Sequence, residues 1–437
     1  MKVSLPPLPN SACTYGAPLL ILALLAGCST ESGMAPSRPP SLPAMATPPE
    51  PPAPDHRLPL DVTYVDSARY DVQPGEVVCL EPGARPFLVL NGLQGRPDAP
   101  VTLTNCPGGT ARLGGDRFGI VLRHSKHLRV VGSASPDDRL GLVVDGGGEA
   151  KVGVSVDQRS TDVELGFLEI KNTTFAGIVA KTEDANAGVP PEERFVLQNL
   201  HVHDTYVHHT GGEGMYLGSS TVGPGQHRLT GLRVHNNVVA QAGWDGIQVS
   251  NATDDAEVHH NVIYQSGTKG QSFHGNGLQI GGNAAGAYHH NLIVDSHIWG
   301  LAVFGTGHID VEKTLISGSQ GVFVDDRKAT RPDVPIRVRA NSFRNIQGTV
   351  VQVLNDIAPV LVSENRLDGD NDWLDTSSGA GANVSLDRNT RVPLDSLRFP
   401  GKKDGNFCLL PASPYAGMGL SHCQYVGFLS RLHAVPP

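Results

Sequence analysis

Two acidic residues, each directly before a glycine, have the types and spacing in this chain that could support acid–base chemistry. Glu213 lies in GGEGMYLG and Asp245 in GWDGIQV, while a third phrase, HGNGLQIGG, has Asn276 in the same place. If the phrases stack in space, two like charges lie close together, and this raises the pKa of one of them. Glycosidases use such pairs at carboxyl separations of about 5–9.5 Å. Acidic residues before glycine also form ordinary turns, which is the competing interpretation.

A second set of polar and aromatic residues follows the same glycines. Tyr216, Gln248 and Gln279 each stand two positions after a glycine, so they would form a column beside the acidic one. Amides and carboxyls bind sugar hydroxyls, and aromatic faces pack on sugar rings, so the two columns predict a groove for a polysaccharide. The predicted substrate contacts are Tyr216, Trp244, Gln248, Asn276, Gln279, Trp299 and His209.

A polysaccharide lyase would instead require a basic side chain near a neutralised uronate. Lys269 and His274, in the long insertion YQSGTKGQSFHGNG, are the nearest candidates, and the chain carries no specific motif of a named lyase family. The predicted catalytic residues are therefore Glu213, Asp245, His274 and Lys269, with hydrolase and lyase chemistry both open.

Metal and cofactor motifs are sparse. Residues 368–372 alternate carboxylates as a calcium loop does, but Trp373 stands where such a loop has glycine, which favours a solvated turn. The sequence has no HExxH motif and no Cys/His zinc spacing. We predict no certain cofactor, keep calcium as an option and assign no metal ligands.

The histidines are concentrated in one part of the chain. Thirteen of the eighteen lie between 201 and 308. In a stacked repeat they would form columns outside the core, and a solvated imidazole ladder is the favoured interpretation, with a metal site or a proton-handling surface as the alternative. His235, His259 and His289 stand two positions before a recurring asparagine, and His203, His260 and His290 one position before it.

The elements that must position these residues belong to a repeat with steps of 23–33 residues. Each copy has two polar residues, an asparagine and an aliphatic stretch, and then a glycine that opens a second apolar stretch. The asparagine series is Asn172, Asp204, Asn237, Asn261, Asn291, Thr314, Asn341 and Asn365, where Asp204 and Thr314 fill gaps. The glycine series is Gly177, Gly214, Gly246, Gly277, Gly300, Gly321 and Gly348.

These repeats predict an all-β, single-stranded, right-handed parallel β-helix over residues 58–400. The apolar runs are strand-sized, and the repeats are too short for the four-stranded blades of a propeller. Asparagine at each corner tolerates a left-handed backbone, and stacked amides can bond from coil to coil inside the cylinder. We expect glycine at the second corner to meet a similar backbone demand.

Both ends of the repeat region resemble one family, the pectate-lyase-like β-helix proteins. Residues 71–113 resemble the opening coils of secreted members, and residues 406–419 (NFCLLPASPYAGMG) resemble the closing coil, so 401–437 is predicted to form a C-terminal coil and cap. The resemblance implies the fold but leaves the activity open, because this fold supports lyases, hydrolases, epimerases and binding modules. The alternative to an enzyme is a noncatalytic surface module for adhesion or scaffolding.

The first 27 residues resemble the signal peptide of a bacterial lipoprotein. The phrase Leu25-Ala26-Gly27-Cys28 matches the lipobox, which implies cleavage before Cys28 and lipidation of its thiol. Residues 29–57 contain nine prolines, so 28–57 is predicted to be a disordered tether. The predicted location is the bacterial cell envelope, on the outer membrane, with the lipid as the only membrane contact.

Charge and cysteines complete the sequence picture. The formal net charge is −9, or −10 without residues 1–27 and their single lysine, which excludes nucleic acid as a favoured partner and makes a highly anionic glycan need a local basic patch. Four cysteines remain beyond Cys13 and Cys28, in three possible pairings. Local pairs, Cys79–Cys106 and Cys408–Cys423, are favoured because they would staple the end coils. We expect a monomer.

Overall fold

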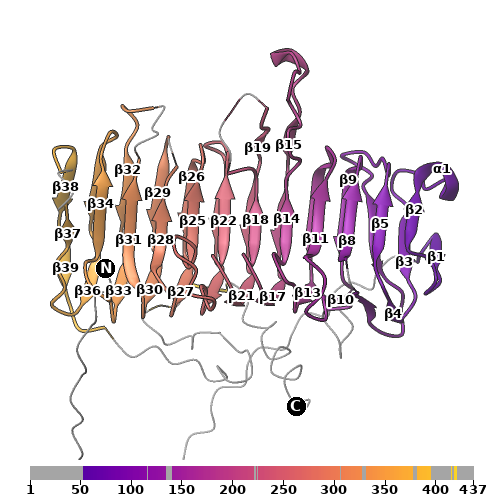
Figure 1. The fold of residues 1–437 in the computed structure, drawn as a ribbon, viewed down its shortest axis with the longest axis horizontal. Helices are drawn as coiled ribbons and strands as arrows, with labels where there is room; N and C mark the ends of the chain where they lie inside the picture. Colours follow the sequence, from indigo (N-terminus) through magenta and orange to yellow (C-terminus); the bar gives the residue numbers. More distant parts are fainter. Residues whose placement is uncertain are drawn as a thin grey trace, which may run out of the picture. The chain divides into compact units, whose positions relative to one another are not determined.

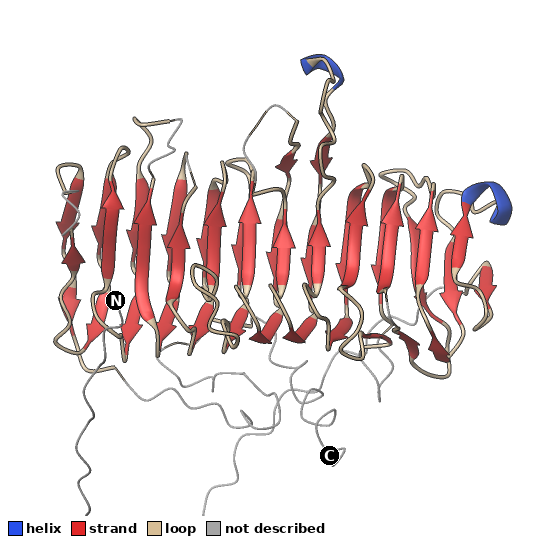
Figure 2. Ribbon diagram, in the orientation of Figure 1, coloured by secondary structure: helices blue, strands red, loops and turns tan. Residues whose placement is uncertain are grey.

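Three stacks of short parallel strands wind into a right-handed β-helix in the computed structural model (Figure 1). The structure describes residues 53–394, except 116, 134–139, 221, 222, 224, 306, 327–330 and 377–380, together with 415 and 418–420. Each full coil contributes one strand to sheet A, then one to sheet C, then one to sheet B. The predicted fold class is confirmed, and the sheets account for nearly all regular structure in the described residues (Figure 2).

Sheet A has 13 strands, and sheets B and C have 12 each. The strands of sheet A are β1 His56–Leu58, β3 Val77–Leu80, β6 Val101–Asn105, β9 Lys126–Val131, β12 Thr161–Gly166, β16 His201–His203, β20 Arg233–His235, β23 Glu257–His259, β26 Gly286–His289, β29 Ile309–Glu312, β32 Ile336–Arg339, β35 Val360–Ser363 and β38 Val384–Asp387. Those of sheet B, which faces the viewer in Figure 1, are β2 Tyr64–Asp66, β5 Leu88–Asn91, β8 Phe118–Arg123, β11 Val152–Asp157, β14 Ile178–Ala180, β18 Met215–Leu217, β22 Ile247–Ser250, β25 Leu278–Gly281, β28 Trp299–Val303, β31 Gln320–Asp325, β34 Val351–Asn355 and β37 Leu374–Asp375.

The strands of sheet C are β4 Gly83–Arg85, β7 Ala111–Leu113, β10 Leu142–Asp145, β13 Leu168–Lys171, β17 Tyr206–Thr210, β21 Val238–Ala242, β24 Val262–Tyr264, β27 Leu292–Val294, β30 Leu315–Ser317, β33 Ser342–Arg344, β36 Arg366–Asp368 and β39 Thr390–Arg391. A two-stranded arm, β15 Val196–Gln198 with β19 Arg228–Thr230, rises from the corner between sheets B and A (Figure 1). The helices are short: α1 is Ser67–Tyr70 and the 3₁₀ helix η1 is Pro191–Glu193.

Aliphatic side chains fill the interior of the coils. In sheet A the register aligns Val202, Val234, Val258 and Tyr288, all of them buried. The period of two in each strand directs such residues inward and their neighbours outward, which explains why the apolar runs of this chain are short. Because every coil repeats this pattern, outward side chains also fall into columns, one coil apart.

The predicted asparagine ladder is present inside the coils. Asn237 donates from Nδ2 to Asn261 Oδ1 at 3.0 Å, and Asn261 donates in the same way to Asn291 at 3.1 Å. Farther along, Asn341 donates to Asn365 at 3.1 Å. The explanation of the corner differs from the prediction, because the left-handed residue is the one before each asparagine, as at His260 with φ 54°. The asparagine itself is selected for the interior hydrogen bonds.

The backward extension of this ladder was wrong at both residues, Asp204 and Asn172. Asp204 is the left-handed residue, with φ 50°, and Thr205 occupies the ladder position, where its hydroxyl donates to Asn237 Oδ1 at 2.7 Å. His203 therefore shares the column of His235, two positions before the ladder residue, and not that of His260. Asn172 lies at the far end of its sheet C strand, aligned with His209 beyond the Lys171–His208 pair. A hydroxyl can replace the amide because the ladder needs only an acceptor and a donor there.

The predicted glycine column is present, but glycine is needed there because a Cβ would clash with the next coil, and not because of the backbone conformation. A Cβ on Gly246 would lie 2.4 Å from Ile263 Cγ2 and 2.6 Å from the carbonyl oxygen of Gly277 in the next coil. Gly177, Gly214, Gly277, Gly300 and Gly321 are similarly crowded, and none of them has a positive φ. Gly348 does not belong, because it has φ 85° and open space around its Cα, and Val350 aligns with this column.

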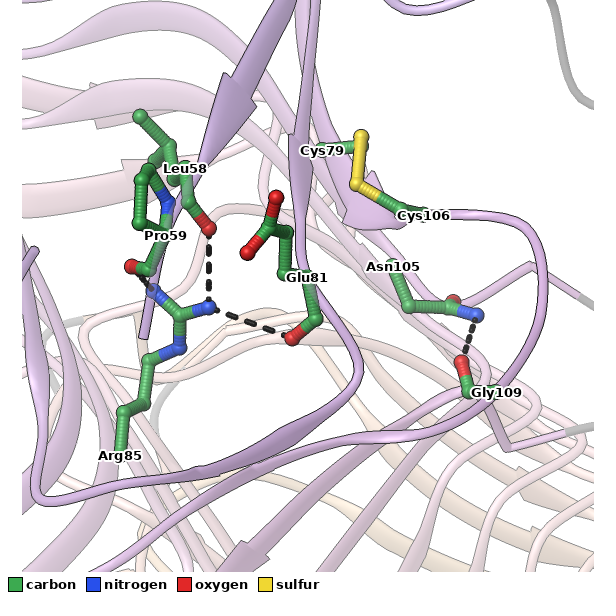
Figure 3. Close-up of a disulfide and its surroundings, with 8 residues drawn as sticks. All are labelled: Leu58, Pro59, Cys79, Glu81, Arg85, Asn105, Cys106 and Gly109. Carbon is green, nitrogen blue, oxygen red and sulfur yellow. Dashed lines mark hydrogen bonds between the residues drawn. A yellow bond between two sulfur atoms is a disulfide. The ribbon is translucent and has the colours of Figure 1, made fainter. Parts of the chain in front are cut away.

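A disulfide joins the first coils, as predicted. Cys79 and Cys106 are bonded across adjacent strands of sheet A (Figure 3). Beside them the buried guanidinium of Arg85 donates to the carbonyl oxygens of Leu58 and Glu81, at 3.2 and 3.3 Å (Figure 3). These bonds supply hydrogen-bond donors to carbonyl groups at the first coil, which has no preceding coil to pair with. The predicted Cys408–Cys423 pair, the lipidated Cys28 and the segment boundaries at 27, 57 and 400 lie outside this part of the structure or stay untested predictions.

Part of the C-terminal segment packs on the outer face of sheet C. Tyr415 joins a cluster with Val262, Leu292 and Leu315, and Gly419 donates its N–H to the carbonyl oxygen of His290 at 2.8 Å. The rest of the predicted 401–437 cap is outside the described residues. Among those residues, no helix has the length and apolar character that a membrane crossing would require.

Candidate functional site

The predicted acidic column exists at the corner where the chain enters sheet B. Backbone N–H groups of Gly214 and Gly246 donate to the carbonyl oxygens of Asp245 and Asn276, at 3.0 and 2.9 Å, which places Glu213, Asp245 and Asn276 one coil apart in sequence. Gly277 continues the pattern by donating to the carbonyl oxygen of Trp299 at 2.8 Å. Parallel pairing thus brings together residues about thirty positions apart.

The second predicted column is also aligned. The register of sheet B pairs Tyr216 with Gln248 and Gln248 with Gln279, and then Gln279 with Ala302. Gln279 is half-buried, whereas Tyr216 and Gln248 are 8% and 3% exposed. The accessible part of this column therefore lies at its Gln279 end.

Asp245 is held rigidly by the loop that follows β24. Its Oδ1 accepts hydrogen bonds from the N–H of Gly275, at 2.9 Å, and from the N–H and Nδ2 of Asn276, at 2.8 and 3.0 Å. Its Oδ2 lies 3.7 Å from His274 Nδ1, an ion-pair separation that is too long for a hydrogen bond. The side chain is fully buried, so Asp245 orients its neighbours and does not meet solvent.

Four buried polar atoms in this cluster have no hydrogen-bond partner among the described residues: Glu213 Oε2, Asp245 Oδ2, His274 Nδ1 and Asn276 Oδ1. Burial, and then the negative charge of Asp245, raise the pKa of Glu213 to about 7. Glu213 therefore keeps its proton in mildly acidic solution, mainly because it is buried, and the like charge of Asp245 that the sequence analysis invoked is a smaller cause.

His274 is the accessible member of the cluster. Its side chain is 36% exposed, and Asp245 raises its pKa against the opposing effect of partial burial. The imidazole stacks on Trp244, with ring centroids 4.8 Å apart. The ring is thus fixed by an indole on one face and a carboxylate at Nδ1, which leaves Nε2 as the nitrogen for a substrate.

The sequence analysis missed one aromatic residue, Phe175, that packs beside Trp244 and Tyr216. Phe175 lies edge-on to Trp244 and Tyr216, at centroid distances of 5.8 and 6.5 Å. Gly212 makes this possible, because a Cβ there would lie 2.7 Å from the Phe175 ring. The paired glycines before Glu213 were the available signal. Lys181 adds a cation 4.2 Å from the centroid of the Tyr216 ring and an ion pair with Glu183.

Lys269 lies beside Gly211, two positions before Glu213. It is exposed on the same insertion as His274, and a Cβ on Gly211 would lie 3.0 Å from its Nζ. Phe273, beside His274, is 86% exposed and has φ 64°. The insertion thus carries an exposed ammonium group and an exposed phenyl ring together with the imidazole of His274.

Two predicted contacts lie apart from this cluster. Trp299 continues the acidic column, but its ring stacks on Phe323 at a centroid distance of 5.2 Å. His209 is at the end of β17, and its Nδ1 lies 2.7 Å from that of His208, whose Nε2 faces Glu169. The described residues contain no group of three or more His, Cys, Asp or Glu side chains placed to hold a metal ion.

The histidines of sheet A form the predicted stacked ladder. The rings of His235, His259 and His289 stack with centroid distances of 5.0 and 4.9 Å. Burial and neighbouring imidazoles lower the pKa of His259 to about 3. His203 is different: although burial opposes it, hydrogen bonds to Asp204 and Glu164 raise its pKa to about 9.

A surface hollow of about 570 Å³ lies over sheet A and not at the Glu213 corner. Arg129, Glu164 and His201 are among its lining residues, and Arg129 forms two hydrogen bonds with Glu164, at 2.8 and 2.9 Å. The sequence analysis did not identify it. One lining atom there, Asp162 Oδ2, is buried without a hydrogen-bond partner, against four such atoms around Glu213, so the Glu213 corner remains the better chemical candidate.

No protein-family model and no curated protein matches this chain. Among solved structures it is similar to the GH136 lacto-N-biosidase of Eubacterium ramulus, at 13% identity and a TM-score of 0.45, covering 78% of this chain and 68% of the other. It is also similar to the A-module of the mannuronan C-5 epimerase AlgE4 of Azotobacter vinelandii, at 16% identity and a TM-score of 0.46, covering 73% of this chain and 87% of the other. A third similar structure is the catalytic unit of the GH87 alpha-1,3-glucanase of Streptomyces thermodiastaticus, at 16% identity and a TM-score of 0.46, covering 79% of this chain and 70% of the other. At these values we draw no conclusion about function from them.

Proposed function

We propose that this chain binds an acidic polysaccharide along the outer edge of sheet B and cleaves it by a lyase-type elimination. The cluster of unpaired buried atoms beside an accessible imidazole carries the proposal. A buried polar atom without a hydrogen bond costs about 1–3 kcal/mol. Glu213 Oε2 and Asn276 Oδ1 have no such bond, and Asp245 Oδ2 and His274 Nδ1 face each other only at 3.7 Å, which indicates a site that serves a ligand or a proton.

His274 is the proposed base. With Nδ1 turned toward Asp245, Nε2 can take the proton from the sugar carbon next to the carboxylate. The electrons of that bond form a carbon–carbon double bond, the bond to the leaving oxygen breaks, and this oxygen takes a proton from water. Asp245 is a positioning residue, because it is sealed from solvent and acts through His274. Glu213, protonated below about pH 7, keeps a second negative charge away from the substrate.

Local charge favours an acidic substrate despite the net charge of −9. At this corner Lys269 is the cation available to a uronate, because Lys181 is paired with Glu183 and His274 is neutral when it acts as the base. Glu213 adds no negative charge below about pH 7. A uronate carboxyl group needs such a partner before its neighbouring proton can be removed. Trp244, Phe273 and Gln279 supply accessible ring faces and an amide for the sugar chain.

The test uses the full chain and a panel of uronate-containing and neutral polysaccharides. We expect new reducing ends together with the ultraviolet absorbance of an unsaturated uronate. His274→Gln should lower the rate by about 10²–10⁴-fold, the usual contribution of an acid–base group. His308→Gln is the matched control, because His308 also pairs with an aspartate, Asp310 at 2.9 Å, but on sheet A.

Other outcomes would overturn the assignment in defined ways. Reducing ends without ultraviolet absorbance would identify hydrolysis, with Glu213 as the acid because its pKa is about 7. Retention of a glycan without cleavage would identify a noncatalytic adhesion or scaffolding module. Equal activity of the His274→Gln and wild-type chains would remove His274 from the chemistry.

We also infer that Cys28 carries a lipid and holds the chain at the bacterial envelope, which the lipobox phrase supports. The predicted proline-rich tether would set the β-helix away from the membrane surface. Cys28→Ala should move the protein from the membrane fraction to the soluble fraction and abolish labelling by a radioactive fatty acid. An unchanged membrane association would contradict the anchor.

A further inference from the structure

Two pairs of consecutive histidines form a second feature of possible chemical use, at the corner between sheets A and C. In the pair His259–His260 the two Nδ1 atoms lie 2.8 Å apart, and in the pair His289–His290 they also lie 2.8 Å apart. The pairs stack on each other: the centroid distance is 4.9 Å for both rings, with interplanar angles of 2° and 6°. All four rings are partly exposed.

The nitrogen separation fits one coordination geometry. At metal–nitrogen distances of about 2.0–2.1 Å, two nitrogens 2.8 Å apart subtend an angle of about 85–90° at the metal. That is the angle between neighbouring ligands in the tetragonal geometry of Cu²⁺ and Ni²⁺. A tetrahedral zinc site would need a separation of about 3.3–3.4 Å.

We propose that each pair chelates one tetragonal transition-metal ion through its two Nδ1 atoms, so that the chain binds two ions one coil apart. The N–H proton that each pair shares would move to the outer Nε2 by a change of tautomer, and water would complete the coordination. The second ion should bind more weakly, because two like charges lie close together.

Two other close histidine pairs are less suited to a metal ion, because one has no room for water ligands and the other lies beside a positive charge. His208 and His209 have Nδ1 atoms 2.7 Å apart, but His208 is 5% exposed and faces Glu169, so water ligands have no room there. His201 and His235 meet through their Nε2 atoms beside His203. Both nitrogens of His203 face carboxylates, at 2.9 and 3.3 Å, so this ring is a cation 4.4 Å from His201 and repels a metal ion.

The probe is Cu²⁺, which ranks highest among these ions for imidazole sites. The full chain, prepared without a histidine tag, is titrated with Cu²⁺ against glycine as a weak competitor, with calorimetry and electron paramagnetic resonance as readouts. We expect two ions per chain, an axial nitrogen-ligated signal and spin coupling when the second ion binds. The double variant His260→Asn with His290→Asn should lose both ions.

Asparagine is the suitable replacement because the preceding coil already has Asn236 at this corner, with φ 55° against 54° at His260. His209→Asn is the matched control: it also lies in the left-handed region, with φ 53°, and should keep both ions. The proposal is overturned if the wild-type chain binds no Cu²⁺ under competition. It is also overturned if the double variant binds as the wild type does, or if His209→Asn alone removes the ions.

Discussion

Two columns of buried polar residues run along this solenoid, and they differ in how their atoms are satisfied. The interior ladder through Asn237, Asn261 and Asn291 is closed, since Asn237 and Asn261 each donate to the next amide and to a backbone carbonyl. The corner column of Glu213, Asp245 and Asn276 is open, with an unpaired buried oxygen on each residue. Both are buried and both repeat once per coil, so burial and periodicity alone do not distinguish structure from function.

The difference follows from hydrogen-bond inventory. An amide has a donor and an acceptor, so amides of one kind can form a chain without limit, whereas ionised carboxylates only accept. A column that contains two acids must take donors from elsewhere, and Asp245 takes three from the loop that carries His274. The acids therefore tie a loop and a titratable group to the corner, while the ladder ties coil to coil.

Breaking the closed column should have the largest effect on stability. Asn261→Ala removes the acceptor for the N–H and Nδ2 of Asn237 and the donor to Val234, all inside the coils. We expect the free energy of unfolding in urea to fall by about 3–5 kcal/mol, with no direct effect on the Glu213 corner.

Asn389→Ala is the matched control, because Asn389 ends the described ladder and is only partly buried. The variant leaves the N–H and Nδ2 of Asn365 without their acceptor, but water can take the place of the partly buried side chain, so the loss should be about 1 kcal/mol. Equal losses in the two variants would show that the ladder does not depend on burial.

The open column should make stability depend on pH. The pKa of Glu213 is about 7 in the folded chain against 4.5 for an exposed glutamate. Between these values the folded chain keeps a proton that the unfolded chain has lost, so stability falls as pH rises through this window. Glu213→Gln has no such titration and should exceed the wild type by roughly 2–4 kcal/mol above pH 7. Urea unfolding at pH 4.5 and pH 8 measures the difference.

Two results would separate burial from other causes in that experiment. A parallel pH profile for the two chains would show that Glu213 is not the group that titrates. A benefit of Glu213→Gln that is equally large at both pH values would point to packing instead of charge.

The smallest expected effect concerns the charge that Asp245 places on His274. Asp245→Asn keeps Oδ1 for its three N–H donors and removes only the charge, so the unfolding free energy should change little. The pKa of His274 should fall, because Asp245 is the main cause that raises it. Nuclear magnetic resonance titration of the His274 ring protons measures this, and an unchanged pKa would contradict the ion pair.

Particular residues show how far sequence reasoning reached at the candidate site. It predicted the alignment of Glu213 with Asp245 and of Tyr216 with Gln248 and Gln279, because a regular repeat brings equal phases together. It did not predict that Asp245 is sealed or that Phe175 packs on Trp244. The burial of Asp245 depends on how the 265–276 insertion folds back over the corner. An insertion does not recur in the other coils, so the repeat does not predict where its residues lie.

The sequence by itself determined the solenoid, its interior amide ladder and the glycine column, because each recurs at a local spacing that winding makes equivalent. For the disulfide it only favoured Cys79–Cys106 among three pairings. The tertiary structure alone decided where the ladder begins, at Thr205 and not at Asp204, and which titratable group meets solvent. Both depend on contacts between neighbouring coils. The loops that join the strands differ in length, so they set which atoms of two coils face each other, and the order of residues along the chain does not show this.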